Sequence, residues 1–356
     1  DLIEYGPAHG AILDRETYNA EDWPTFRQNA ARSGCAGTVV AETLQVAWER
    51  SLGGRLTSPV VADGRLFVAL SDACSVHALD AADGTPLWSF TTSARIDGPP
   101  TAYCGLVLFG CADGWVYCLR SRDGAIVWRR RAAPEVSRIM NRGRLESPWP
   151  VHGSVLVQKD IAYFSAGRSS FLDGGIFIYA VDPATGELLQ SSRLSSLDPE
   201  TDDMVDSPGS YDMPPDALGG LNDILVGDGT SVYMRHLKFN SSELTHRSAA
   251  EDLPGTQDRK LYPALGAHLM SVAGLLDDAW FNQTYWTIDG RAQSKLLVYD
   301  DETAFGVKPY PGAARHSRVI FRPGGEGYAI NATRRPEHKT QWSVRASIRP
   351  LAMLLA

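Results

Sequence analysis

The chain has 356 residues, including 33 glycines and 21 prolines spread along its length, and its formal net charge is −8. An acidic chain lacks the broad basic face with which proteins neutralise phosphates, so we expect no nucleic-acid partner. No run of about 18 uninterrupted apolar residues is present, so we also expect no membrane span. The length exceeds that of one ordinary core, which leaves several domains or one large repeat architecture.

The first part of the chain, residues 1–43, is interpreted as a lead-in, and residues 44–356 as the region that carries the fold. Residues 44–48 read LQVAW, a short apolar run that predicts a strand ending in Trp48. In a ring of sheets, such a strand can form the outer strand of the last sheet and pair an edge that would otherwise stay open. We therefore expect residues 44–48 to close the ring.

The strongest signal is an internal repeat with a period of 40 residues. One set of positions recurs in the same order and spacing: Arg55, Pro59, Asp83, Gly84 and Trp88 return as Arg95, Pro99, Asp123, Gly124 and Trp128. Between them lie short β-branched and apolar runs separated by Asp-Gly pairs, which supply the positive φ angles of tight hairpin turns. A unit of this length with four short strands is typical of one propeller blade.

Tryptophan occupies the same place in both clear units. Trp88 and Trp128 each follow the last glycine of their unit by four residues, on the strand expected to lie outermost. A large ring at that place can cover the gap between neighbouring sheets, so we interpret both tryptophans as packing residues.

Further units follow the two clear ones. A third carries an insertion over residues 168–175, where the earlier units have a short turn. The predicted blades lie near residues 55–90, 95–130, 144–194, 222–265, 268–290 and 295–345, with a partial blade over 346–356. The sequence thus predicts an all-β chain folded as a β-propeller of four-stranded blades. We expect seven blades, with six or eight as alternatives, and a truncated last blade.

The five cysteines are predicted to be buried free thiols. Cys111 and Cys118 flank a tight turn, and if Cys111 faces Trp115, then Cys118 faces Leu108. At about 3.3 Å per residue the two sulfur atoms then lie too far apart for a disulfide. No cysteine pair has the spacing of a metal site, so we expect no metal ligand set.

Two segments resemble the repeat of the pyrroloquinoline-quinone-like, or quinoprotein-like, propeller family. Residues 77–88 read HALDAADGTPLW, and residues 179–186 read YAVDPATG. Residues 23–27, WPTFR, are similar to the lead-in of bacterial members. The resemblance implies a propeller, and it implies an adjacent cysteine pair and a calcium site in the quinone-dependent alcohol dehydrogenases of the family. No two cysteines are adjacent here, so we expect neither PQQ nor another cofactor; other members resemble non-catalytic scaffolds.

Cationic residues occupy the same position in several of the repeat units. Arg55, Arg95 and Arg144 occupy equivalent positions before the innermost strands, while His268 and Lys295 lie near that position in later units. Together with Arg168 on the insertion, they predict an anion site at the mouth of the central channel, because guanidinium groups suit carboxylates and sulfates. The alternative is that each arginine pairs with a carboxylate of a neighbouring blade.

A second set of residues has the types required for sugar binding and acid–base chemistry. The candidate catalytic residues are His152, His236, Asp173 and Asp278. Trp280 and Tyr285 add aromatic surface on which a sugar could stack.

These patterns favour a periplasmic or secreted propeller that binds an anionic small molecule or oligosaccharide, such as an acidic sugar, or a protein partner. One alternative is a carbohydrate-active enzyme, a lyase or hydrolase acting on uronic-acid sugars. The other is a non-catalytic scaffold for protein assembly. The sequence alone does not decide whether the protein is an enzyme.

Overall fold

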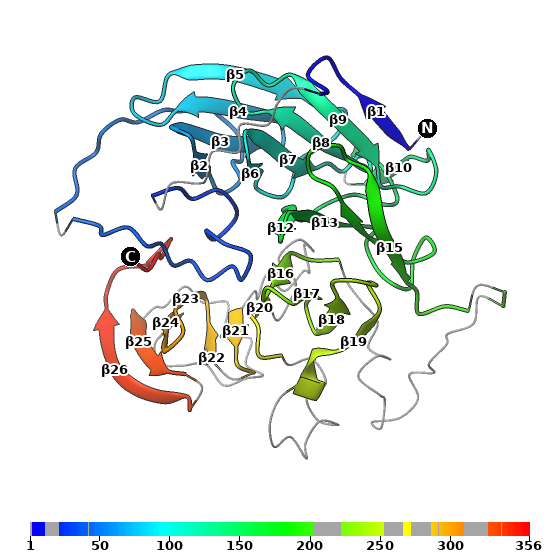
Figure 1. Cartoon of the computed structure of the whole chain (residues 1–356). Coiled ribbons are helices and arrows are strands. Elements are labelled where there is room, and N and C mark those ends of the chain that lie inside the picture. Colours follow the sequence, from blue (N-terminus) through cyan, green and yellow to red (C-terminus); the bar gives the residue numbers. More distant parts are fainter. Residues whose placement is uncertain are drawn as a thin grey trace.

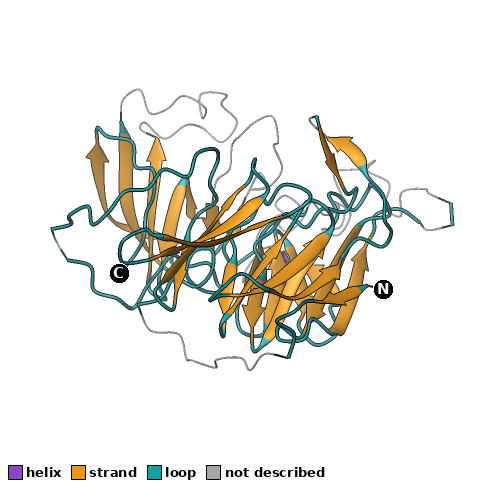
Figure 2. Ribbon diagram, turned by 90° about the horizontal axis from the view of Figure 1, so that it is seen from above, coloured by secondary structure: helices purple, strands orange, loops and turns teal. Residues whose placement is uncertain are grey.

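The computed structural model describes residues 2–10, 21–41, 43–141, 143–198, 200–201, 222–252, 266–271, 286–290, 292–309, 327–335 and 337–356. Within them, antiparallel sheets follow one another around a central axis (Figure 1). Figure 2 shows that strands dominate the described part of the chain, and its one short helix is a 3-10 turn over Ala249–Asp252. The all-β propeller predicted from the repeat is confirmed.

The first two sheets correspond to the two clear repeat units. The first contains β2 (Val60–Ala62), β3 (Arg65–Leu70), β4 (Ser75–Asp80) and β5 (Pro86–Thr91). The second contains β6 (Thr101–Tyr103), β7 (Leu106–Gly110), β8 (Trp115–Arg120) and β9 (Ile126–Arg131), with β1 (Ile3–Tyr5) added at its outer edge.

The later sheets follow the same plan. The third contains β12 (Leu156–Gln158), β13 (Ile161–Ala166), β14 (Ile176–Val181) and β15 (Leu188–Leu194). The fourth contains β16 (Leu225–Gly227), β17 (Ser231–Met234), β18 (Leu237–Asn240) and β19 (His246–Ser248). Described strands of the fifth are β20 (Met270–Ser271), β21 (Trp286–Ile288) and β22 (Ala292–Ser294). The sixth contains β23 (Leu296–Tyr299), β24 (Thr303–Pro309), β25 (Tyr328–Arg334) and β26 (Lys339–Ala346).

Asp-Gly turns create the hairpins, as their sequence predicts. Asp63 and Gly64 both have positive φ angles, 52° and 68°, in the turn between β2 and β3. Glycine reaches such angles at no steric cost and aspartate tolerates them, so the chain reverses direction within two residues. The first strands β2, β6, β12 and β16 contact one another in series, which places them innermost.

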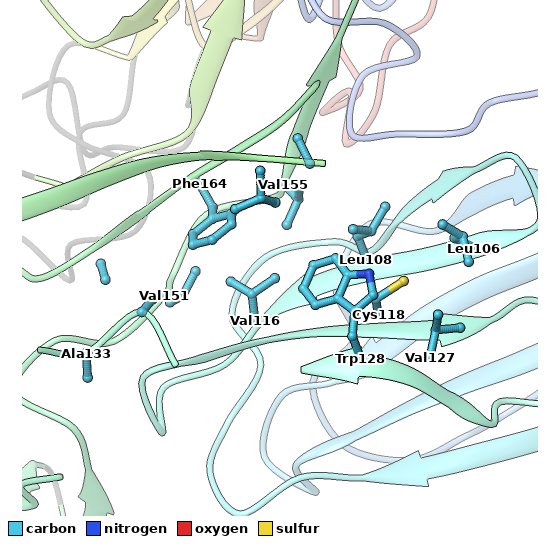
Figure 3. Close-up of a cluster of buried hydrophobic side chains, with 14 of the residues drawn as sticks. Leu106, Leu108, Val116, Cys118, Val127, Trp128, Ala133, Val151, Val155 and Phe164 are labelled. Carbon is cyan, nitrogen blue, oxygen red and sulfur yellow. The ribbon is translucent and has the colours of Figure 1, made fainter. Parts of the chain in front are cut away.

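Each repeat tryptophan packs against the next sheet. Trp128, on β9, is fully buried, and its indole nitrogen donates to the carbonyl of Pro183 at 3.0 Å. Its ring lies directly over Gly186, where a Cβ atom would approach within 2.6 Å. Figure 3 shows the surrounding apolar cluster, to which Val151 and Phe164 of the third unit contribute. The predicted packing role of the tryptophans follows from this geometry.

The expected closing strand over residues 44–48 is wrong, because no strand forms there. Trp48 nevertheless makes the repeat contact: its indole nitrogen donates to the carbonyl of Ala81 at 3.0 Å, and its ring lies over Gly84. The Trp48 side chain therefore makes the same contact as the repeat tryptophans, although the backbone around it pairs with no neighbouring strand.

The lead-in, residues 1–43, contacts several of the sheets. Strand β1 pairs antiparallel with β9, so it extends the second sheet. Residues 22–36 then pass along several inner strands: Trp23 forms a bridge with Val61, and Gly227 donates to the carbonyl of Ala30. The Tyr299 hydroxyl donates to the carbonyl of Ala31, 268 positions away in the sequence. This segment thus joins the first, fourth and sixth sheets.

The C-terminal residues also meet the lead-in. The expected inner strand beyond residue 346 is reduced to an isolated parallel bridge between Leu355 and Cys35. All five cysteines are free, and Leu108 faces Cys118 in the β7–β8 register, as predicted; only Cys111 and Cys118 are buried, so the expected burial is wrong for the other three. Among the described residues, no helix has the length and apolar character that crossing a membrane demands.

Candidate functional site

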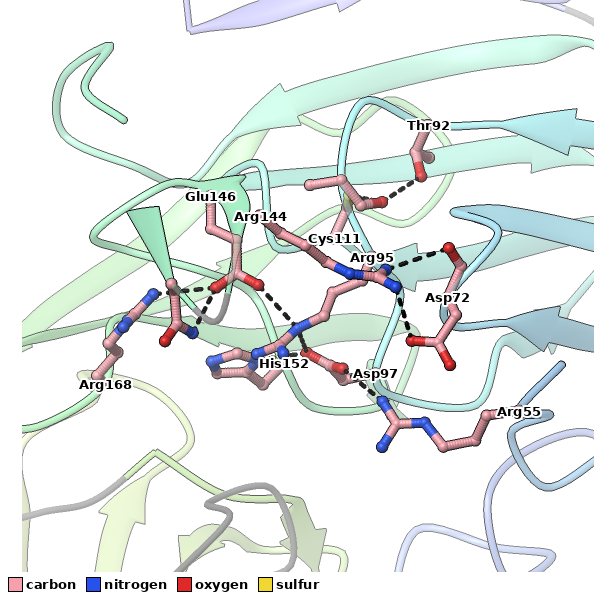
Figure 4. A network of polar contacts seen from close by, with 12 residues as sticks. Arg55, Asp72, Thr92, Arg95, Asp97, Cys111, Arg144, Glu146, His152 and Arg168 are labelled. Atoms are coloured by element: carbon pink, nitrogen blue, oxygen red, sulfur yellow. Dashed lines mark hydrogen bonds and ion pairs between the residues drawn. The ribbon is translucent and has the colours of Figure 1, made fainter. Parts of the chain in front are cut away.

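Four predicted arginines converge on one polar network, which we call the arginine cluster. It consists of Arg55, Arg95, Arg144 and Arg168, the carboxylates of Asp72, Asp97 and Glu146, and His152 (Figure 4). Most of these residues come from segments that connect one sheet to the next, and Arg144 and Glu146 lie on β11 (Arg144–Glu146). The repeat explains the convergence, because equivalent segments of successive sheets meet around the axis.

Asp97 connects the first half of the cluster. Its carboxylate accepts hydrogen bonds from Arg95 Nε at 3.1 Å and His152 Nδ1 at 2.7 Å, and Arg55 Nη2 lies 3.8 Å away. Burial opposes ionisation of this carboxyl, but the hydrogen bond and the charges around it outweigh burial and lower its pKa. Asp97 is therefore an ionised acceptor that holds three basic side chains.

Glu146 connects the second half. Its side chain is fully buried, with Arg95 Nε at 3.0 Å, Arg168 Nη2 at 3.1 Å and the Asn141 amide at 2.9 Å. Arg95 lies between the two carboxylates, so the halves form one network. A buried carboxylate is tolerated when cations and donors surround it in this way.

Arg144 occupies the outer part of the cluster. Its Nη1 donates to the backbone carbonyl of Asp72 at 3.1 Å, and its Nη2 lies 3.2 Å from the Asp72 carboxylate. Asp72 belongs to the turn between β3 and β4 of the first sheet. This contact links the first sheet to β11, and it leaves both charged groups close to solvent.

The predicted alternative, in which each arginine pairs with a carboxylate, therefore describes part of the arrangement. The two acids at the centre are shielded, with side chains 13% exposed for Asp97 and 0% for Glu146. The arginines at the outside are 60% exposed for Arg55 and 41% for Arg144. Four guanidinium groups thus face three carboxylates, and of these carboxylates only that of Asp72, 51% exposed, lies at the outside beside Arg144.

Other predicted site residues lie outside the cluster. Asp173 has a backbone carbonyl that accepts the Trp149 indole N–H at 2.6 Å. Lys295 lies beside Arg349 in the sixth unit; burial and that neighbouring charge lower its pKa. Asp278, Trp280 and Tyr285 fall outside the described residues.

The two other predicted histidines, His236 and His268, lie apart from the cluster. His268 stacks on Tyr233 with ring centroids 4.0 Å apart, and its Nε2 donates to the carbonyl of Arg235 at 2.6 Å. Burial lowers the pKa of His268 to about 4. Burial and the charge of Arg235 likewise lower the pKa of His236 to about 4. Both imidazoles are neutral at pH 7, so they do not extend the cationic surface.

The importance of Asp97 was missed from the sequence, although a signal was present. The segments Arg95-Ile96-Asp97 and Arg144-Leu145-Glu146 both place an acid two positions after the arginine. Side chains two positions apart in extended backbone point to the same side, so each segment presents a cation and an acid together. The first unit has Thr57 at that place, which leaves Arg55 without a local acid.

No three His, Cys, Asp or Glu side chains within the described ranges are grouped so that they could hold a metal ion. Those ranges include all five cysteines, each of them free.

Residues 34–211 match the model of a protein family that is described as outer membrane protein assembly factor BamB. Among curated proteins, BamB of Burkholderia pseudomallei is 32% identical over 107 residues, which is 30% of this chain and 28% of that protein. BamB of Yersinia pestis is 25% identical over 211 residues, 56% of this chain and 49% of that protein. The dehydrogenase subunit of a quinone alcohol dehydrogenase from Gluconobacter oxydans is 26% identical over 159 residues, 41% of this chain and 20% of that protein. The chain thus matches less than half the length of each of these relatives.

Solved structures share the fold at low identity. The quinohemoprotein alcohol dehydrogenase of Comamonas testosteroni superimposes with a TM-score of 0.56 and 12% identity, over 94% of this chain and 68% of that one. A europium-containing methanol dehydrogenase gives a TM-score of 0.52 with 12% identity, over 94% of this chain and 80% of that one. At such identity the likeness is one of architecture, and function has to be argued from the site.

Proposed function

The chain belongs to the PQQ-like repeat family of β-propellers, which includes the BamB assembly factors, and we propose that it binds an anionic ligand at the arginine cluster. The ligand is an acidic sugar or a protein partner with acidic side chains. The relatives named for outer membrane protein assembly agree with the extracytoplasmic location expected from the sequence.

The observation that carries this proposal is the order of charges within the cluster. Asp97 and Glu146 lie inside, whereas Arg55 and Arg144 expose their guanidinium groups. The inner acids hold the arginines in place, while the outer cations remain accessible to an external acceptor. Fixed, pre-oriented guanidinium groups bind carboxylates and sulfates with less loss of side-chain entropy than mobile ones.

Unused donors support the same conclusion. Arg95 contacts both acids through Nε alone, and within the described part of the chain its two terminal nitrogens have no hydrogen-bond acceptor. Arg55 contributes only a 3.8 Å ion pair to the network. Both guanidinium groups can therefore donate to a further carboxylate in the paired geometry that arginine favours.

The test is a calorimetric titration of the purified protein, once with a galacturonate oligosaccharide and once with a sulfated oligosaccharide. Replacing Arg55→Gln removes an exposed cation whose one contact with the inner acids is the 3.8 Å ion pair with Asp97, and we expect binding about 10-fold weaker. The matched control is Arg122→Gln, because Arg122 is 64% exposed and pairs with Asp123 in a turn of the second sheet. Equal affinities of both variants and the parent protein would refute binding at the cluster.

A carbohydrate-active enzyme is the second candidate, and one contact favours it. His152 donates through Nδ1 to Asp97, an arrangement that orients an imidazole as a general base, and Arg95 lies on the same carboxylate. In a lyase, arginine would neutralise the uronate carboxylate while His152 Nε2 removed the adjacent proton; a C=C bond would form as the glycosidic C–O bond broke, and the released oxygen would take a proton from water. An increase in ultraviolet absorbance from unsaturated uronate, lost in His152→Gln while binding persists, would support this candidate.

A further inference from the structure

A two-stranded ribbon beside the arginine cluster has an apolar face that no described residue covers. The ribbon consists of β10 (Ile139–Asn141) and β11. In its register Met140 lies opposite Leu145, and their side chains are 67% and 53% exposed. Val136, which precedes the ribbon, is also exposed. Single exposed apolar residues are ordinary, but a cross-strand pair on one face of a ribbon, with a third exposed apolar residue three positions before the ribbon, marks an interaction surface.

The opposite face of the ribbon belongs to the cluster. Asn141 lies opposite Arg144, and its amide donates to Glu146 at 2.9 Å. Arg144 in turn contacts Asp72. Because side chains alternate along a strand, anchoring this polar face fixes Met140 and Leu145 on the outer face. The apolar pair is therefore held in a defined position and does not move freely with a loop.

Exposed arginines lie close to this apolar face. Arg138, directly before the ribbon, is exposed, and within the described residues no carboxylate pairs with it. Arg144 and Arg55 expose their guanidinium groups on the adjoining cluster. An occupant that covers the whole surface must combine apolar side chains with negative charge. An acidic oligosaccharide supplies the charge but lacks aliphatic side chains to cover Met140 and Leu145.

We infer that the ribbon and the arginine cluster together dock a protein segment in which acidic and apolar side chains alternate. The inference rests on the proposed function, because it names the class of ligand that the cluster binds. An extended segment that pairs with an edge of the ribbon presents alternate side chains to the two faces of the ribbon, so one set can lie beside Met140 and Leu145 while the other reaches Arg144 on the opposite face. Charge complementarity selects the acidic partner, and the apolar pair selects protein over sugar.

The test uses three synthetic peptides measured by fluorescence polarisation with the whole chain. One alternates Asp and Leu, the second alternates Asn and Leu, and the third alternates Asp and Ser. We expect the Asp-Leu peptide to bind most tightly, because only it supplies both kinds of contact. Binding of that peptide to the double variant Met140→Ser, Leu145→Ser should weaken by about 10- to 100-fold, as expected for losing two partly buried aliphatic contacts.

The matched control is the double variant Leu188→Ser, Leu189→Ser, which removes a similarly exposed apolar pair from β15. It should bind the Asp-Leu peptide like the parent protein. No binding of this peptide, or equal binding to the ribbon variant and the parent, overturns the inference. If the galacturonate oligosaccharide still binds and still depends on Arg55, the proposed function survives that failure. If no probe depends on Arg55, the proposed function and the inference fail together.

Discussion

The contact between neighbouring sheets makes a quantitative prediction about Trp128. The side chain is fully buried, lies over Gly186 and donates to the carbonyl of Pro183. Truncating a buried tryptophan to alanine removes its apolar contacts and leaves a cavity, which costs about 3–5 kcal/mol. It also leaves the Pro183 carbonyl without its donor, which adds to the cost. We expect Trp128→Ala to lower the free energy of unfolding by at least 3 kcal/mol, and Trp128→Phe, which keeps much of the ring, to cost about 2 kcal/mol.

The assay is urea unfolding followed by far-ultraviolet circular dichroism, which reports strand content rather than tryptophan emission. Trp88 and Trp48 make the same hydrogen bond and cover Gly124 and Gly84, but both are only half-buried. Their alanine variants should therefore cost less than Trp128→Ala, about 1–3 kcal/mol each. The reasoning is refuted if Trp128→Ala unfolds at the same urea concentration as the parent protein, or if Trp48→Ala costs more than Trp128→Ala.

Three further predictions follow from the same structure. The pKa values of His236 and His268 are both lowered to about 4 in the folded chain. Between pH 6.5 and pH 4 these imidazoles therefore bind protons in the unfolded chain but stay neutral in the folded chain. Stability should be complete above pH 6.5 and fall towards pH 4 by up to about 1.4 kcal/mol per pH unit for each histidine, and His268→Phe should flatten that slope in urea titrations. Gly186→Ala should cost at least 1 kcal/mol in urea titrations, because φ is +71° there and the new Cβ atom would meet the Trp128 ring. Asp97→Asn should lower the melting temperature because it replaces the negative charge shared by Arg95 and His152 with a neutral amide, a loss of about 3 kcal/mol that an unchanged calorimetric transition would contradict.

The sequence predicted those parts of the fold that depend on local chemistry. The 40-residue period, the Asp-Gly turns and the position of Trp128 each arise within one unit, and each appears in the structure at its predicted place. The contacts of residues 22–36 could not be predicted in the same way. Ala30 and Ala31 use backbone carbonyls to reach Gly227 and Tyr299, and a carbonyl acceptor leaves no trace in the amino-acid pattern. The strand expected to end in Trp48 failed for a related reason, since an apolar run does not specify which edge, if any, it will pair with.

The site shows where sequence periodicity stops being informative about charge. Arg55, Arg95 and Arg144 occupy equivalent positions, so the repeat alone predicts three equivalent cations. The structure makes them unequal, because Asp97 and Glu146 are buried beside Arg95, whereas Arg144 reaches an exposed acid and Arg55 has only a distant one. Ion pairs at the surface contribute little energy and exchange partners readily, whereas buried pairs are costly to disturb. The inner pairs therefore fix the shape of the cluster, and the outer arginines are the ones that can exchange an internal partner for an anionic ligand.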